Sequence, residues 1–165
     1  MCQFRSADVV YNSSNQSITV YILPNSDSHT AIKMKYNIRD DGFLAKHCPI
    51  EYVPTKALDD FDSYDFIFGA GKPDWWLDEH ETQVKRELQA NIKSLLSENK
   101  LEWDGDLRLD SLTSLPEGVT LTAGRYLFLD SLTSLPAGGT IKAQDIYYAG
   151  RWHGPIYRKG KNEYT

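Results

Sequence analysis

The chain has 165 residues, of which 41% are hydrophobic and 25% charged, and its formal net charge is −5. This composition excludes disordered and fibrous classes, and the length fits one compact domain or a small domain with an appended module. No apolar run reaches the roughly 18 residues of a spanning helix, and the polar N-terminal segment lacks the apolar stretch of a signal peptide. We therefore expect a cytoplasmic protein that contacts no membrane.

The first 76 residues predict a small α+β unit. Two β-rich runs, 8–11 and 17–23, flank the turn-forming segment NSSN at 12–15, which indicates a hairpin. Residues 30–38 fit either a strand or a short helix. We expect two further strands, at 50–54 and 64–68.

The segment FGAGKP at 68–73 has the glycines and the lysine of a phosphate-binding loop, but in the wrong order. A nucleotide P-loop needs GxxxxGK followed by Ser or Thr, whereas Pro73 follows Lys72 here and lacks an N–H donor. A strand-to-helix turn is the plain interpretation. A phosphate or nucleotide site of an enzyme at Gly69–Lys72 is the alternative.

A helix is predicted over residues 78–97, because Val84, Leu88 and Ile92 repeat at a spacing of four. Asp78 and Glu81 have the spacing of a capping box at its start. Just before this helix, one of two adjacent tryptophans, Trp75 and Trp76, is expected to pack onto it. The other could also belong to the core, or it could be exposed as an anchor for a partner. The acidic residues expected around this anchor are Asp59, Asp60, Asp62, Asp74, Asp78 and Glu79.

A 20-residue repeat follows the helix. LDSLTSLPEGVTLTAGRYLF at 109–128 and LDSLTSLPAGGTIKAQDIYY at 129–148 share 11 identical positions without a gap. A fixed period of this length is typical of solenoids, in which each unit buries its apolar face by stacking on the next. Stacking would place Asp110 beside Asp130. This acidic pair could bind a metal or a basic partner, or it could be an exposed corner at which water screens the two charges.

The motifs LTSLPEG at 112–118 and LTSLPAG at 132–138, with the L-x-L pairs between them, resemble the leucine-rich-repeat-like solenoids of enteric bacteria and their prophages. The resemblance covers about residues 101–148. It implies a short parallel β-solenoid that serves as a scaffold or recognition surface, and it supplies no common catalytic residues.

The C-terminal segment interleaves aromatic and basic residues. Residues 142–165 contain five basic and two acidic side chains, whereas residues 51–110 contain seven basic and fifteen acidic side chains. The basic end could be an irregular end cap with a soluble tail, or a platform for single-stranded nucleic acid, on which bases stack and cations meet phosphates. The acidic middle argues against nucleic-acid binding. The residues of this alternative surface are Tyr147, Tyr148, Arg151, Trp152, His153, Tyr157 and Arg158.

Cysteine and histidine do not form a recognisable catalytic or metal-binding pattern. Cys2 and Cys48 are too few for a disulfide framework or a four-cysteine zinc site, so we expect reduced thiols. The segment DEHE at 78–81 has Val84 where the HExxH motif of zinc hydrolases needs its second histidine. We expect neither a metal nor a cofactor. The histidines are His29, His47, His80 and His153.

The predicted fold class is therefore α+β: a small N-terminal α+β unit, a bridging and capping helix, and a short C-terminal β-solenoid. The predicted function is non-catalytic recognition of a host protein that presents a basic surface, as a phage or prophage accessory protein would bind a defence or regulatory factor. The predicted divisions are 1–76 for the unit, 77–98 for the helix, 99–158 for the coils and end cap, and 159–165 for a basic tail.

Overall fold

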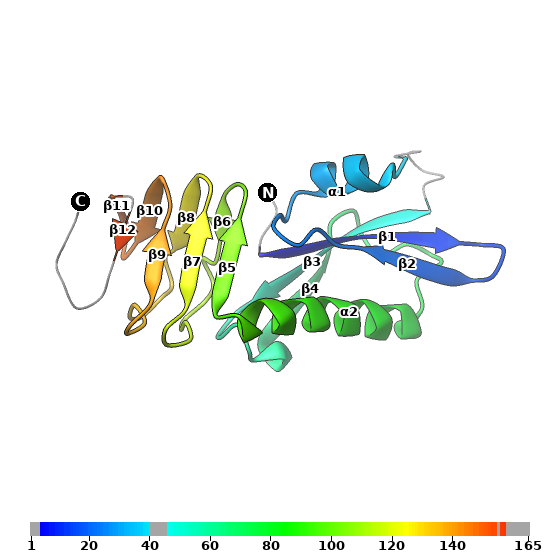
Figure 1. The fold of residues 1–165 in the computed structure, drawn as a ribbon. Helices are drawn as coiled ribbons and strands as arrows, with labels where there is room; N and C mark the ends of the chain where they lie inside the picture. The colour runs from blue at the N-terminus through cyan, green and yellow to red at the C-terminus, as the bar shows by residue number, and fades with distance from the viewer. Residues whose placement is uncertain (1–3, 40–45, 155, 158–165) are drawn as a thin grey trace.

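The computed structural model describes residues 4–39, 46–154 and 156–157 (Figure 1). Its first sheet is antiparallel, with the strand order β2-β1-β3-β4. The predicted hairpin is confirmed by the pairing of the first two strands, and the ambiguous segment forms a helix, α1 (His29–Tyr36). The four strands are β1 (Arg5–Asn12), β2 (Ser17–Tyr21), β3 (His47–Pro54) and β4 (Tyr64–Phe68).

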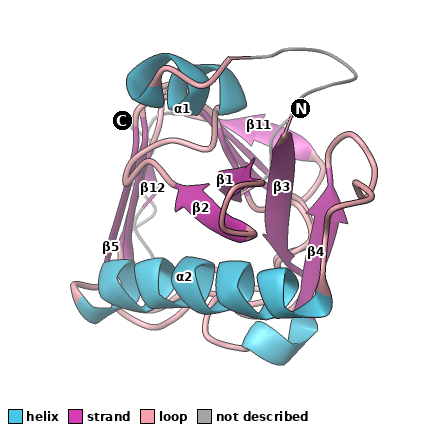
Figure 2. Cartoon of the chain, turned by 90° about the vertical axis from the view of Figure 1, so that its right-hand side faces the viewer, coloured by secondary structure: helices cyan, strands magenta, loops and turns pink. Residues whose placement is uncertain are grey.

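The long helix α2 (Asp78–Ser97) has the predicted bounds. Val84, Leu88 and Ile92 are fully buried, as their spacing predicts. Helices α1 and α2 lie on opposite sides of the first sheet (Figures 1 and 2), which is why strand β1 is buried on both faces. A short 3-10 turn, η2 (Phe61–Ser63), precedes β4.

The repeat forms two sheets of short strands. One has the order β12-β9-β7-β5 and the other β11-β10-β8-β6. In the first, Leu101 pairs with Leu121 and Leu121 with Ile141, which keeps the 20-residue step of the repeat. The strands are β5 (Lys100–Trp103), β6 (Leu107–Arg108), β7 (Thr120–Ala123), β8 (Tyr126–Leu129), β9 (Thr140–Lys142), β10 (Asp145–Tyr148), β11 (Arg151–His153) and β12 (Ile156–Tyr157).

The prediction of a C-terminal β-solenoid is wrong, because the repeat does not close into coils. Each unit supplies only two strands of two to four residues, and the L-x-x-L-P segments between them, 109–119 and 130–139, contain no strand. The outermost strands β11 and β12 also pair antiparallel, which ends the parallel stacking at once. The C-terminal part is therefore two small open sheets within a mixed α+β fold.

The end of the repeat is also more regular than an irregular cap. Strands β10 and β11 form a hairpin whose turn, Ala149-Gly150, has φ values of 52° and 74°. Two central residues with positive φ match the right-handed twist of hairpin strands. The hairpin thus adds one antiparallel strand to the edge of the sheet.

One continuous core joins these parts. Phe4, before β1, stacks on Trp103 of β5 at a centroid distance of 5.7 Å and donates its backbone N–H to the carbonyl of Arg108. The same cluster of buried side chains extends from Val84 of α2 to Leu127 of β8. The sheets of the repeat are thereby held against the N-terminal sheet (Figure 1).

Candidate functional site

The outer face of the sheet β11-β10-β8-β6 carries a row of large side chains. Cross-strand pairing aligns Arg108 with Phe128, Phe128 with Tyr147, and Tyr147 with Trp152. Paired residues point to the same face of a sheet, and alternate residues of a strand point to opposite faces. The intervening residues Leu127 and Ile146 accordingly point into the core, where they are buried.

The rings of this row contact one another. Trp152 lies 5.7 Å from Phe128 and 5.2 Å from Tyr147 between ring centroids, in both cases edge to face. Tyr126, one pair further along β8, lies 5.6 Å from Trp152. Trp152 is 52% exposed and Tyr126 is 37% exposed, so a large aromatic surface faces solvent. We call Phe128, Tyr147 and Trp152 the aromatic row.

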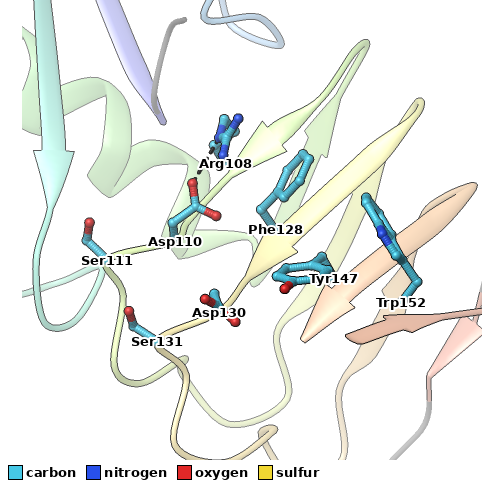
Figure 3. A pocket seen from close by; sticks show the side chains of 8 residues that line it. All are labelled: Arg108, Asp110, Ser111, Phe128, Asp130, Ser131, Tyr147 and Trp152. Carbon is cyan, nitrogen blue, oxygen red and sulfur yellow. Dashed lines mark hydrogen bonds and ion pairs between the residues drawn. The ribbon is translucent and has the colours of Figure 1, made fainter. Parts of the chain in front are cut away.

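Beside the aromatic row lies an open pocket of about 550 Å³ (Figure 3). Its rim contains Asp110 and Asp130, which occupy the same position in successive repeats, together with Ser111 and Ser131. The predicted proximity of the two repeats at this corner is confirmed, because Ser131 donates its backbone N–H to the carbonyl of Asp110.

Arg108 closes one end of the pocket. Its Nε donates to Oδ2 of Asp110 at 2.9 Å, and its guanidinium lies 4.3 Å from the centroid of the Phe128 ring. Asp130 instead accepts the backbone N–H of Gly150 in the hairpin turn, at 3.2 Å. The two equivalent aspartates therefore differ in that only Asp110 is paired with a cation among the described residues.

The alternative surface predicted from the C-terminal segment is split between two faces. Tyr147 and Trp152 lie on the outer face, whereas Tyr148, Arg151 and His153 lie on the other side of the hairpin by the same alternation. There Nε2 of His153 lies 3.1 Å from the carbonyl of Tyr148, and the Tyr148 ring packs partly against the core. Tyr157 is placed only as a residue of β12, and Arg158 lies outside the described residues.

The two tryptophans before α2 do not provide an exposed anchor. Trp76 is 4% exposed and packs in the core against Phe68. Trp75 is half-buried and stacks on Tyr11, with ring planes 11° apart. In this part of the chain the more exposed apolar side chain is Leu77, at 48%.

The predicted acidic residues form two separate groups. Asp74, Asp78 and Glu79 lie at the start of α2, and Asp59, Asp60 and Asp62 lie around η2. The ring of Phe61 in η2 lies 5.2 Å from Nζ of Lys93, so η2 lies near the C-terminal part of α2. Residues 78 and 93 are about 22 Å apart along the helix axis. The structure therefore does not gather these carboxylates around one anchor.

The predicted capping box is replaced by a histidine. Leu77 is the N-cap residue, and its backbone N–H donates to Nδ1 of the buried His80 at 3.1 Å. Asp78 points to solvent and pairs with Lys72 at 3.7 Å. A carboxylate beside Lys72 and an amide of Gly69 that already donates to the carbonyl of Pro49 both argue against a phosphate site at 69–72.

Sequence reasoning missed a buried cluster between β1, β3 and α1. Asp8 is fully buried, and both of its oxygens contact histidine rings, those of His29 and His47. Cys48 is buried nearby, and burial, followed by the negative charge of Asp8, raises the pKa of its thiol to about 12. A neutral buried thiol is a poor nucleophile. No spacing in the sequence signals this cluster, because its residues come from three separate elements.

Phe128 and Arg108 were also missed as members of the site. A signal was present in the alternation of Tyr126-Leu127-Phe128-Leu129, which places two rings on the face opposite two core leucines. The parallel pairing then brings Phe128 beside Tyr147, at a step of 19 rather than 20 residues. Alignment of the repeat at 20 residues hides this contact.

Among the described residues, no group of three or more histidine, cysteine or acidic side chains is arranged to hold a metal ion, and in the Asp8 cluster both histidine rings contact the carboxylate itself. Within the same part of the chain, the helices are too short or too polar to cross a membrane. Comparison with known proteins found no matching family model, no matching curated protein and no matching solved structure.

Proposed function

We propose that the protein is a non-catalytic recognition module that binds a protein partner through the outer face of the sheet β11-β10-β8-β6. The exposed aromatic row is the observation that supports this proposal. Interfaces are enriched in Tyr, Trp and Phe, and a few large side chains near the centre supply most of the binding energy. Trp152 has the exposure and the neighbouring rings of such a residue.

The charges of this face favour a basic partner. Four aspartates, at positions 106, 110, 130 and 145, stand against two arginines, at 108 and 125, which leaves a net of −2. This balance also disfavours a phosphate backbone, so single-stranded nucleic acid is a weaker candidate despite the stacked rings. An acidic face would instead speed the encounter with a basic protein surface.

The resemblance of the 112–118 and 132–138 motifs to repeats of enteric bacteria and prophages supports a more specific proposal. The protein acts as a phage or prophage accessory protein that binds a host defence or regulatory protein and inhibits or modulates it. Action in the reducing cytoplasm suits the buried free thiol of Cys48.

The proposal is tested by comparing capture by three immobilised full-length proteins: wild type, Trp152→Ala and Leu77→Ala. Leu77 is a matched control because its exposed fraction, 48%, is close to the 52% of Trp152, and it lies on another face. Captured proteins from an enteric bacterial lysate are quantified by mass spectrometry. We expect at least one protein to be retained by wild type and Leu77→Ala and lost from Trp152→Ala.

The captured protein is then purified and its Kd measured. A hot-spot tryptophan is worth at least about 2 kcal/mol, so Trp152→Ala should raise Kd by about thirtyfold or more. If every captured protein binds wild type and Trp152→Ala equally, the outer face is not the recognition surface and the proposal fails.

A further inference from the structure

We infer that the pocket beside the aromatic row receives one cationic side chain, a lysine or an arginine, from the partner protein. This inference rests on the proposed function and names the chemistry that the partner presents at the same site. It follows from a comparison of the two repeats. Both contain a carboxylate and a neighbouring aromatic ring, but only the first repeat also supplies the cation that lies between them.

In the first repeat, the cation belongs to the chain. The guanidinium of Arg108 lies between the Asp110 carboxylate, at 2.9 Å, and the face of the Phe128 ring, at 4.3 Å. A cation is thus held by a carboxylate on one side and by the negative face of an aromatic ring on the other.

In the second repeat, the carboxylate and the ring recur without the cation. Asp130 is the equivalent of Asp110 in the second repeat, and both line the pocket. Phe128 pairs with Arg108 on one side and with Tyr147 on the other, so Tyr147 is the ring next to position 128. Position 128, however, carries phenylalanine where position 108 carries arginine. Among the described residues Asp130 pairs with no basic side chain, and its Oδ1 accepts the backbone N–H of Gly150. Figure 3 shows Asp130 at the pocket with the three rings above it.

The neighbouring arginines do not supply the cation beside Asp130. Arg108 is already paired with Asp110, and Arg125 donates to Asp106 at 3.0 Å at the far end of the face. An anion in the pocket would be repelled by the Asp130 carboxylate. A cation would meet an opposite charge and the rings that attract it, so charge complementarity selects the cation.

The inference is tested on the full-length ¹⁵N-labelled protein, by following the tryptophan indole N–H signals during titration with small probes at constant ionic strength. The probes are Nα-acetyl-arginine methylamide and Nα-acetyl-lysine methylamide as cations, Nα-acetyl-norleucine methylamide as the neutral control, and Nα-acetyl-glutamate as the anion. We expect a saturable shift of the Trp152 signal with a cationic probe, while the signals of Trp75, Trp76 and Trp103 stay in place.

The Asp130→Asn variant should weaken binding of that probe about twofold to fivefold, which is the upper part of the range for an exposed ion pair. Asp145→Asn is the matched control, because Asp145 is exposed on the same face beside Tyr126 and does not line the pocket. Its affinity should match that of the wild type. Equal shifts by the norleucine compound, a preferred shift by the glutamate compound, or no shift of Trp152 by any probe would each overturn the inference.

Failure of this inference is distinguishable from failure of the proposed function. If Trp152→Ala abolishes capture of the partner while Asp130→Asn leaves its Kd unchanged, the face recognises a protein but takes no cation. If capture is indifferent to Trp152→Ala, the proposed function itself is wrong.

Discussion

Nδ1 of His29 lies 3.0 Å from Oδ2 of Asp8, and the carboxyl group is fully buried at that point. The ring of His47 contacts the other oxygen through Nε2. An ionised carboxylate can only accept hydrogen bonds, so each imidazole donates one. This cluster fastens α1 to β1 and β3, and it makes the stability of the fold depend on pH.

Asp8→Asn should destabilise the protein at neutral pH and flatten its acid response. Burial alone would raise the pKa of Asp8, but the hydrogen bonds and charges of His29 and His47 outweigh it and hold the pKa below its ordinary value of 3.8. A carboxyl with a lowered pKa contributes stability above that ordinary value and loses it as the pH falls through the folded-state pKa.

We expect Asp8→Asn to cost about 1–3 kcal/mol at pH 7, as for other disrupted buried hydrogen bonds. Urea titrations at several pH values between 2 and 7 measure both effects. A variant whose free energy of unfolding falls as steeply as that of the wild type below pH 4 would show that Asp8 does not carry this dependence.

The thiol of Cys48 should resist alkylation in the folded protein. Burial, and then the charge of Asp8, raise its pKa to about 12, and the side chain is 2% exposed. In a Cys2→Ser background, iodoacetamide at pH 8.5 should modify the native protein at least about a hundredfold more slowly than the urea-unfolded protein, because little thiolate forms. Equal rates, measured by intact mass, would place Cys48 at the surface.

The helix and the N-terminal hairpin could be predicted because local patterns determine them. Val84, Leu88 and Ile92 define a face that must be buried, and the bounds 78–97 follow from that stripe. The N-cap could not be predicted, because the acceptor is the side chain of His80, held in place by the rings of Trp75 and Trp76. That arrangement depends on tertiary packing.

The site was harder to predict because it depends on pairing between strands. The repeat correctly indicated that Leu101, Leu121 and Ile141 stack, but periodicity alone does not show whether the units close into coils. The step between β8 and β10 is one residue shorter, and it sets which rings meet. Because of this shorter step, Phe128 pairs with Tyr147 rather than with Tyr148.

Gly139→Ala should destabilise the repeat although it adds only one methyl group. A Cβ at Gly139 would lie 2.3 Å from the carbonyl oxygen of Val119, the equivalent residue of the preceding unit. The two backbones must separate to admit it, which costs about 1–3 kcal/mol.

Gly105→Ala is the control, because a Cβ there meets nothing within 4 Å and the residue does not have positive φ. It should change the free energy of unfolding by less than about 0.5 kcal/mol. Thermal and urea unfolding of both variants measure the difference. Equal stabilities would mean that the units do not approach each other as closely at this point.

Trp152→Ala should lower the free energy of unfolding much less than Trp76→Ala, because the first side chain is assigned to binding and the second stabilises the core. Trp76 is 4% exposed and packs against Phe68, so its loss should cost about 3–5 kcal/mol. Trp152 is half exposed, and its ring contacts in the described part of the chain are with rings of the outer face, so its loss should cost less than that of Trp76, about 1–2 kcal/mol. Urea titrations followed by far-UV circular dichroism compare the two variants. A loss at Trp152 as large as that at Trp76 would show that the aromatic row stabilises the hairpin, and it would remove the reason for assigning this exposed ring to a partner.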